Sequence, residues 1–198
     1  LKIRVCDPAM GSGHFLSEVL GVLADRYQKA LYKGASSESL TTEEAKRFIK
    51  EAASFSKAIL VFSGGEPLLR EDIYELIRYA GEFGLKPTLA TNASLISRET
   101  AGRLKEAGLK LAAVSLYGAT AKNHNSFCGQ SGAFEKTLEG IKNLKNANIP
   151  LQINTTITRK NLAEIEQIGE FALSAGALSY HIFFLVPVFS CPYLYSFF

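Results

Sequence analysis

Apolar residues along this chain fall into short runs, separated by longer segments in which they recur every three or four positions. The short runs have the length of strands and lie at 3–6, 58–62, 86–90, 111–116, 151–157 and 180–186. The segments between them have helical spacing and predict helices at 15–32, 42–55, 71–83, 98–107, 133–146 and 162–174. A strand and a helix therefore alternate six times along the chain.

Local signals mark where several of these helices begin and end. Thr41 and Glu44 have the spacing of a capping box, in which each side chain binds the other residue's backbone amide. Asn161 and Glu164 repeat that spacing before the last helix, and Ser97 precedes the fourth. The glycines that stand where helices commonly end are Gly84, Gly108 and Gly176.

The alternation of strands and helices restricts the fold class to α/β with parallel strands. Strands joined through helices pair in parallel, with right-handed crossovers. An open doubly wound sheet and a complete or partial (β/α) barrel both meet this condition. In both architectures ligands bind at the carboxyl ends of the strands. The residues that follow each strand are therefore the candidates for a functional site.

Composition excludes several classes of protein. The 198 residues are 47% hydrophobic and 21% charged, which suffices for a substantial core and excludes a disordered chain. The net charge of +3 includes no block of like charges, so we expect no nucleic-acid partner. With no signal peptide and no apolar run of the ~18 residues that a membrane span needs, we expect a cytoplasmic protein without membrane contact. The sequence gives no indication of the oligomeric state.

A glycine-rich turn follows the first predicted strand. The string DPAMGSGHFL at 7–16 would let the backbone approach a ligand closely and direct its amides at it, although a tight turn without a ligand also accounts for it. Over residues 2–32 the chain resembles the first motif of N6-adenine DNA methyltransferases. That resemblance implies that Asp7, Gly11 and Gly13 hold S-adenosylmethionine (SAM).

The other strand ends carry a second set of signals. After the second strand, Gly64 and Gly65 remove the steric barrier of a Cβ, and Pro67 turns the chain toward the next helix. A buried Glu66 carboxylate in that loop would need a partner, for which an ammonium group is suited. The later strand ends carry TNAS at 91–94, VSLYG at 114–118, HNSFCG at 124–129 and NTTITRKN at 154–161.

Together with FSGGEPLLR at 62–70, these segments give residues 34–188 a close likeness to the core of a radical SAM enzyme. The likeness is strongest to the branch that includes haem-biosynthesis and peptide-modifying enzymes. It implies a partial (β/α)6 barrel with outer helices and SAM as the cofactor. It also implies a parent activity on a tetrapyrrole or peptide, so the partner would be a small-molecule or peptide substrate.

The same resemblance assigns the cofactor-binding residues, while no catalytic residue is assigned. Gly64, Gly65 and Glu66 would receive the methionyl amino group of SAM, with Pro67 completing the turn. Asn92 would line the pocket, Ser115 would approach the carboxylate or ribose, Asn154 would contact SAM, and Pro187 would lie near the adenine. Ser115 and Asn154 have an equally good local interpretation, in which each satisfies neighbouring backbone groups.

The cluster motif of the family is missing. Radical SAM enzymes hold a [4Fe–4S] cluster on CxxxCxxC after the first strand, whereas this chain has only the scattered Cys6, Cys128 and Cys191. One thiolate cannot hold such a cluster, so we predict no metal site and incomplete radical chemistry. We also expect His124 to be a loop or cap residue rather than a ligand, and Asn125 replaces the more usual Asp of the family.

Three interpretations follow. In the first, a methyltransferase-like strand, loop and helix at 1–33 is joined to the barrel core at 34–188 and to an apolar tail at 189–198. In the second, the chain is a derivative that has lost its cluster and survives as a SAM-binding or catalytically dead binding module. In the third, it is a fragment of a SAM-dependent N6-adenine DNA methyltransferase, for which SCPY at 190–193 is a near match to the catalytic motif.

Overall fold

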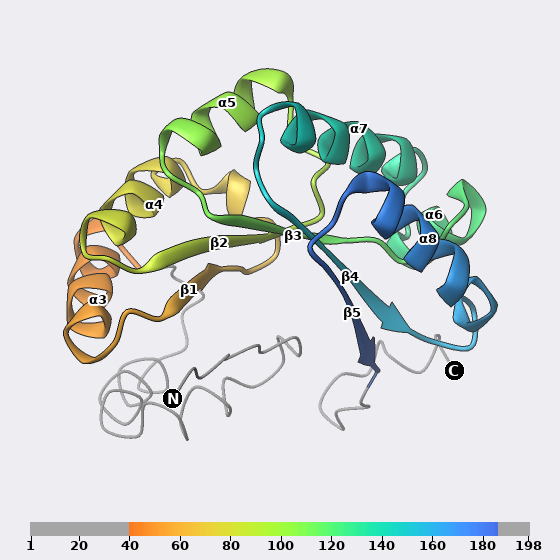
Figure 1. Ribbon diagram of the computed structural model, residues 1–198, viewed down its shortest axis with the longest axis horizontal. Helices are drawn as coiled ribbons and strands as arrows, with labels where there is room; N and C mark the ends of the chain where they lie inside the picture. The colour runs from red at the N-terminus through yellow and green to blue at the C-terminus, as the bar shows by residue number, and fades with distance from the viewer. Residues whose placement is uncertain (1–39, 186–198) are drawn as a thin grey trace.

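The computed structural model describes residues 40–185, which form a curved sheet with helices packed along its outside (Figure 1). Five strands lie in the order β1-β2-β3-β4-β5, and every neighbouring pair is parallel. The strands are β1 (Ile59–Phe62), β2 (Lys86–Thr91), β3 (Leu111–Ser115), β4 (Leu151–Ile157) and β5 (Ser179–Phe184). The strand predicted at 3–6 and the helix predicted at 15–32 lie outside the described residues.

The helices of the described residues lie along the convex side of the sheet (Figure 1). They are α3 (Thr42–Phe55), α4 (Ile73–Glu82), α5 (Arg98–Glu106), α6 (Ala121–Cys128), α7 (Ala133–Asn146) and α8 (Ile165–Ala175), with 3₁₀ turns η1 (Pro67–Leu69) and η2 (Leu162–Glu164). A doubly wound sheet has helices on both faces and a reversal of strand order. The strand order and the one-sided helices therefore confirm the partial barrel and exclude the doubly wound alternative. Among residues 40–185, no helix is both long and apolar enough to cross a membrane.

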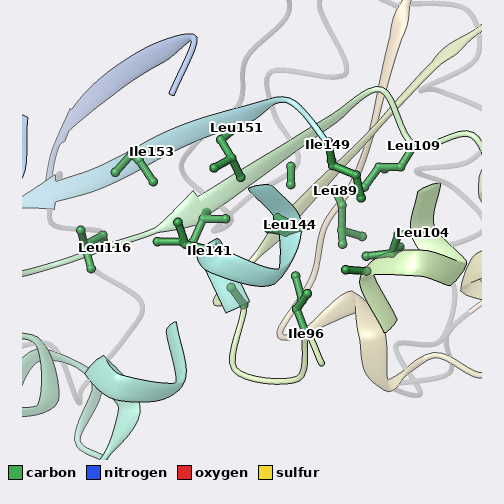
Figure 2. Close-up of a cluster of buried hydrophobic side chains, with 14 of the residues drawn as sticks. Leu89, Ile96, Leu104, Leu109, Leu116, Ile141, Leu144, Ile149, Leu151 and Ile153 are labelled. Atoms are coloured by element: carbon green, nitrogen blue, oxygen red, sulfur yellow. The ribbon is translucent and has the colours of Figure 1, made fainter. Parts of the chain in front are cut away.

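The main core lies between the convex face of the sheet and the helices (Figure 2). Leu89 on β2 and Ile153 on β4 point outward from the sheet, and both are fully buried. Leu104 on α5 and Leu144 on α7 are equally buried and belong to the same cluster. Fully burying one such side chain contributes about 1.5–3 kcal/mol. This layer makes the sheet a rigid support for the residues on its opposite face.

The concave face of the three central strands carries small and polar side chains near their carboxyl ends. Side chains alternate between faces along a strand, so Gln152, Asn154 and Thr156 of β4 share the concave face. The register places Ser115 of β3 beside Asn154, with His181 of β5 on its other side. Polar groups from three strands are thereby brought to one surface.

Most of the predicted helix ends are confirmed. Thr41 and Glu44 form the predicted capping box at the start of α3, and the Ser97 hydroxyl accepts a hydrogen bond from the Thr100 amide at 3.0 Å. The three glycines predicted to end helices all have positive φ angles: Gly84 (80°), Gly108 (88°) and Gly176 (78°).

The capping box predicted at Asn161 and Glu164 is wrong. The Asn161 side-chain oxygen, which would form the cap, accepts from the Thr158 amide at 2.7 Å, and its NH₂ group donates to the carbonyls of Tyr117 and Thr156, both at 2.9 Å. Glu164 instead accepts a hydrogen bond from the Ala119 amide at 2.9 Å. Thr158 before the helix and Ala119 from a distant loop therefore take the two side chains that would form the cap. The α-helix begins three residues later than predicted, after a 3₁₀ turn.

Candidate functional site

A pocket of about 480 Å³ opens at the carboxyl ends of the strands. This volume lies within the range of small-molecule and cofactor sites. Its lining comes from the loop after β1, the ends of β2 to β5, and helices α6 and α7. The lining residues are Ser63, Gly64, Gly65, Ala90, Thr91, Asn92, Ser94, Ser115, Tyr117, His124, Cys128, Gln130, Ala133, Thr137, Asn154, Thr156 and Phe183.

Five of the seven residues predicted to bind the cofactor line this pocket, namely Gly64, Gly65, Asn92, Ser115 and Asn154. Glu66 and Pro67 follow the lining glycines but are not among the lining residues. The additional residue predicted near the adenine, Pro187, lies outside the described part of the chain. The sequence therefore indicates the pocket's position, while the binding role of each residue stays a prediction.

The loop after β1 gives the pocket an open backbone wall. Gly64 has a φ angle of 151°, a conformation that residues with a Cβ rarely adopt. A Cβ added at Gly65 would meet no other heavy atom within 4 Å. The fold therefore requires glycine at the first position, whereas the space beside the second is open to a ligand.

The Glu66 carboxylate joins the loop after β1 to the end of β2. It accepts hydrogen bonds from the Thr91 hydroxyl at 2.8 and 2.9 Å. It also accepts from the backbone amides of Asn92 at 2.9 Å and Leu68 at 3.3 Å. The predicted need of the buried carboxylate for a partner is therefore met by these donors rather than by an ammonium group. Pro67 is buried at the start of η1, where a missing amide hydrogen has no cost.

The loop after β2 is held against helix α7. The Thr137 hydroxyl donates to the Asn92 carbonyl at 3.0 Å. A Cβ added at Gly140 would lie 2.2 Å from the Ala93 carbonyl oxygen, so glycine is needed for this close approach. Within the loop, the Asn92 side-chain oxygen accepts from the Ser94 amide at 2.8 Å. Hydrogen bonds therefore hold both the backbone carbonyl and the side chain of Asn92 in place.

His124 links the loop after β3 to the loop after β2. Its Nδ1 accepts a hydrogen bond from the Tyr117 amide at 3.2 Å, so the proton of the neutral ring is on Nε2. Nε2 lies 3.5 Å from the Thr137 hydroxyl, which in turn donates to the Asn92 carbonyl. Only 2% of His124 is exposed, and this burial lowers its pKa. The residue is therefore a buried, neutral part of α6 rather than the expected loop or cap residue.

Tyr117 and Cys128 complete the wall around His124. The Tyr117 ring stacks on Phe127 with a centroid distance of 4.1 Å. Burial raises the pKa of Tyr117, and a hydrogen bond with Ser115 opposes the shift. The Cys128 sulfur lies 3.4 Å from His124 Nε2, and burial raises the pKa of this thiol as well. Both groups are therefore protonated at neutral pH and present weakly polar surfaces to the pocket.

The described residues contain no candidate for the cluster. Between residues 40 and 185 no three His, Cys, Asp or Glu side chains gather closely enough to hold a metal ion. Cys128 is a free cysteine. Cys6 and Cys191, the methyltransferase-like segment at 2–32 and the tail at 189–198 lie outside the described residues.

Comparisons with known proteins agree with this fold. The Radical SAM superfamily profile matches residues 25–172. The AdoMet-dependent heme synthase of Methanosarcina barkeri is 49% identical over 160 residues, which are 78% of this chain and 46% of that protein. The PqqA peptide cyclase of Rhodopseudomonas palustris is 37% identical over 138 residues, which are 70% of this chain and 37% of that protein.

A solved structure shows the same fold at lower identity. Streptococcus suis SuiB bound to S-adenosylmethionine has a TM-score of 0.67 and 20% identity, with 77% of this chain and 36% of that one covered. The chain belongs to the radical SAM superfamily, as the profile match over most of its length establishes. It spans less than half the length of the two curated relatives.

Proposed function

We propose that the pocket binds S-adenosylmethionine and that the chain is the cofactor-binding core of a radical SAM enzyme. The observation that carries this proposal is the juxtaposition of the open Gly64–Gly65 loop with the polar side chains of Ser115 and Asn154 around one pocket. The family of the chain implies SAM as the ligand. SAM, when bound to a reduced cluster, supplies a 5′-deoxyadenosyl radical.

The residues present suit the charges of SAM. Its methionyl ammonium is a donor, and the carbonyls of the exposed loop at Gly64 and Gly65 are acceptors. Its carboxylate and ribose need donors, which hydroxyl and amide groups such as those of Ser115 and Asn154 supply. The absence of a Cβ at Gly65 allows the ligand to approach the backbone. We therefore assign binding and orientation of SAM to these four residues.

The pocket offers groups that suit SAM, but we find no ligands for a [4Fe–4S] cluster among the described residues. The sequence has no CxxxCxxC segment, and the described residues gather no set of metal ligands. We therefore derive no radical step for this chain.

For the substrate we propose a tetrapyrrole or a peptide. Support comes from the relatives, whose names specify heme synthesis in one case and peptide cyclisation in the other. Both names describe proteins more than twice as long as the matched segment. Substrate turnover is thus proposed for an enzyme that contains this core, while SAM binding is proposed for the core itself.

Isothermal titration calorimetry with SAM tests the binding proposal. We expect saturable binding by the wild-type chain, a loss of at least tenfold in affinity for Gly65→Ala, and little change for Gly13→Ala. The reverse pattern would place SAM at the methyltransferase-like turn. No heat of binding in the wild-type chain would indicate a binding module that has lost SAM.

A separate experiment addresses the cluster. Anaerobic incubation with iron and sulfide should leave no stoichiometric [4Fe–4S] cluster by absorption and electron paramagnetic resonance. It should also yield no 5′-deoxyadenosine from SAM under reducing conditions. A redox-active cluster with product formation would contradict the claim that the cluster ligands are missing.

A further inference from the structure

Three polar side chains form a chain of hydrogen bonds beneath the pocket. Ser179 Oγ donates to Gln152 Oε1 at 3.2 Å, and Gln152 Nε2 donates to Asn154 Oδ1 at 2.7 Å. Gln152 and Asn154 are two residues apart on β4 and therefore share the concave face. Ser179 is the register partner of Gln152 on β5. The chain of bonds runs from the floor of the sheet to Asn154, which lines the pocket.

The burial of Gln152 makes the loss of either hydrogen bond costly. Only 8% of the residue is exposed, so water does not readily replace a lost partner. In the structure the hydroxyl of Ser179 donates to the Gln152 oxygen, and the Gln152 NH₂ group faces Asn154. The Asn154 oxygen then accepts from Gln152, and the Asn154 NH₂ group is left to donate to a ligand in the pocket. Reversing Gln152 alone would set two oxygens against each other, and leaving a buried polar group unpaired costs about 1–3 kcal/mol.

We propose that Gln152 is a positioning residue that fixes the polarity of Asn154, so that β4 presents a hydrogen-bond donor to the bound ligand. This inference rests on the proposed binding of SAM and specifies which groups of SAM face each wall of the pocket. Acceptor groups of SAM, such as the carboxylate or the ribose oxygens, face β4. The ammonium group faces the opposite wall, which the loop after β1 provides.

The substitution Gln152→Glu tests the polarity. At pH 8 an ionised carboxylate accepts but cannot donate, so it would bind the Asn154 NH₂ and turn the Asn154 oxygen into the pocket. We expect the Kd for SAM, measured by calorimetry, to rise about tenfold, which corresponds to ~1.4 kcal/mol. Asn154→Asp should give a loss of the same size. Gln167→Glu, the same change at an exposed position on α8, should leave the Kd within about twofold of wild type. Wild-type affinity in Gln152→Glu would overturn the proposal.

A second variant guards against a folding defect. Gln152→Met has a similar shape without polar groups, so it should keep the fold and allow the Asn154 amide to rotate. We expect an intermediate loss of SAM affinity, with a thermal midpoint close to that of wild type. Unchanged affinity in this folded variant would count against a positioning role.

Side-chain amide hydrogen exchange by NMR tests the orientation without SAM. In the wild-type chain the NH₂ protons of Gln152 should be protected and those of Asn154 should exchange rapidly. In Gln152→Glu the Asn154 protons should become protected. The opposite pattern in the wild type would overturn the proposal. If the wild type did not bind SAM, the proposed function would fail, while the exchange measurement would still decide the role of Gln152.

Discussion

The carboxylate of Glu66 accepts hydrogen bonds from the hydroxyl of Thr91, with oxygen–oxygen distances of 2.8 and 2.9 Å. The two residues are 25 positions apart: Glu66 lies in the loop after β1, and Thr91 is the last residue of the neighbouring strand β2. One side chain therefore holds together two of the loops that surround the pocket. The glutamate of this loop has a structural role in addition to any contact with a ligand.

Replacing Glu66 with Gln should weaken this connection. The NH₂ group of Gln would face one of the two backbone amides that now donate to the carboxylate, so the bond from either Leu68 or Asn92 would be lost. We expect a decrease of about 1–3 kcal/mol in the free energy of unfolding, measured with urea. Glu71→Gln, the same change at an exposed position, serves as the control. Equal stability of the two variants would show that the Glu66 bonds contribute nothing.

The adjacent glycines should differ in their response to alanine. Gly64→Ala forces a Cβ into a φ angle of 151°, and we expect a loss of about 1–3 kcal/mol in stability. Gly65→Ala meets no atom within 4 Å, so its thermal midpoint should be close to that of wild type. If Gly65→Ala were strongly destabilised, its loss of SAM binding would reflect a folding defect rather than a blocked contact with the ligand.

Two helical glycines offer a sharper comparison. A Cβ at Gly140 would lie 2.2 Å from the Ala93 carbonyl oxygen, whereas one at Gly102 would meet nothing within 4 Å. Gly102→Ala should stabilise the protein by up to ~1 kcal/mol, because alanine is the better helix former. Gly140→Ala should destabilise it by about 2 kcal/mol or more through overpacking. Urea unfolding of both variants measures the difference, and effects of the same sign would contradict the observed approach of α7 to the loop after β2.

Burial of His124 should make stability depend on pH. Its pKa is lowered in the folded state, mainly by desolvation, with Glu135 opposing. Below the unfolded pKa of about 6.5, the unfolded chain binds a proton that the folded chain excludes. The contribution of neutral His124 to stability is thus complete above this pH and is lost as the pH falls toward the lowered folded pKa.

The measurement compares wild type with His124→Gln between pH 7.5 and 5.5. The wild type should lose stability on acidification, with a slope from this residue of at most ~1.4 kcal/mol per pH unit. The Gln variant should be less stable at pH 7.5 but should show a smaller decrease over the same range. Parallel pH profiles would mean that His124 titrates alike in the folded and unfolded chains.

Where local chemistry determines an element, the sequence was sufficient to predict it. Thr41 and Glu44 satisfy each other over three residues, and their capping box is confirmed. Asn161 and Glu164 have the same spacing, but the Thr158 amide occupies the Asn161 oxygen and the distant Ala119 amide occupies the Glu164 carboxylate. Sequence spacing alone does not reveal such competing partners.

The sequence predicted the residues of the pocket that lie at strand ends but not those that lie on helices. Residues directly after strands, such as Ser115 and Asn92, were found because parallel strands bring their carboxyl ends to one edge. His124 and Thr137 line the same pocket from helices α6 and α7. His124 was expected to be a loop or cap residue, and no strand-end rule points to Thr137. Helix α6 itself was not predicted. Its N-cap at Thr120 and its left-handed glycine at Gly129 were the signals that would have revealed it.

The agreement between strand order and chain order has a consequence for synthesis on the ribosome. Each strand pairs with a neighbour that has already emerged, so the sheet can lengthen as translation proceeds, without rearrangement. The pocket walls then appear in sequence, from Ser63 to Phe183. At about 5–20 residues per second, several seconds separate the first wall from the last. A nascent chain arrested before β4 would have the glycine loop but no opposite wall, and it should gain affinity for SAM only when Asn154 has left the exit tunnel.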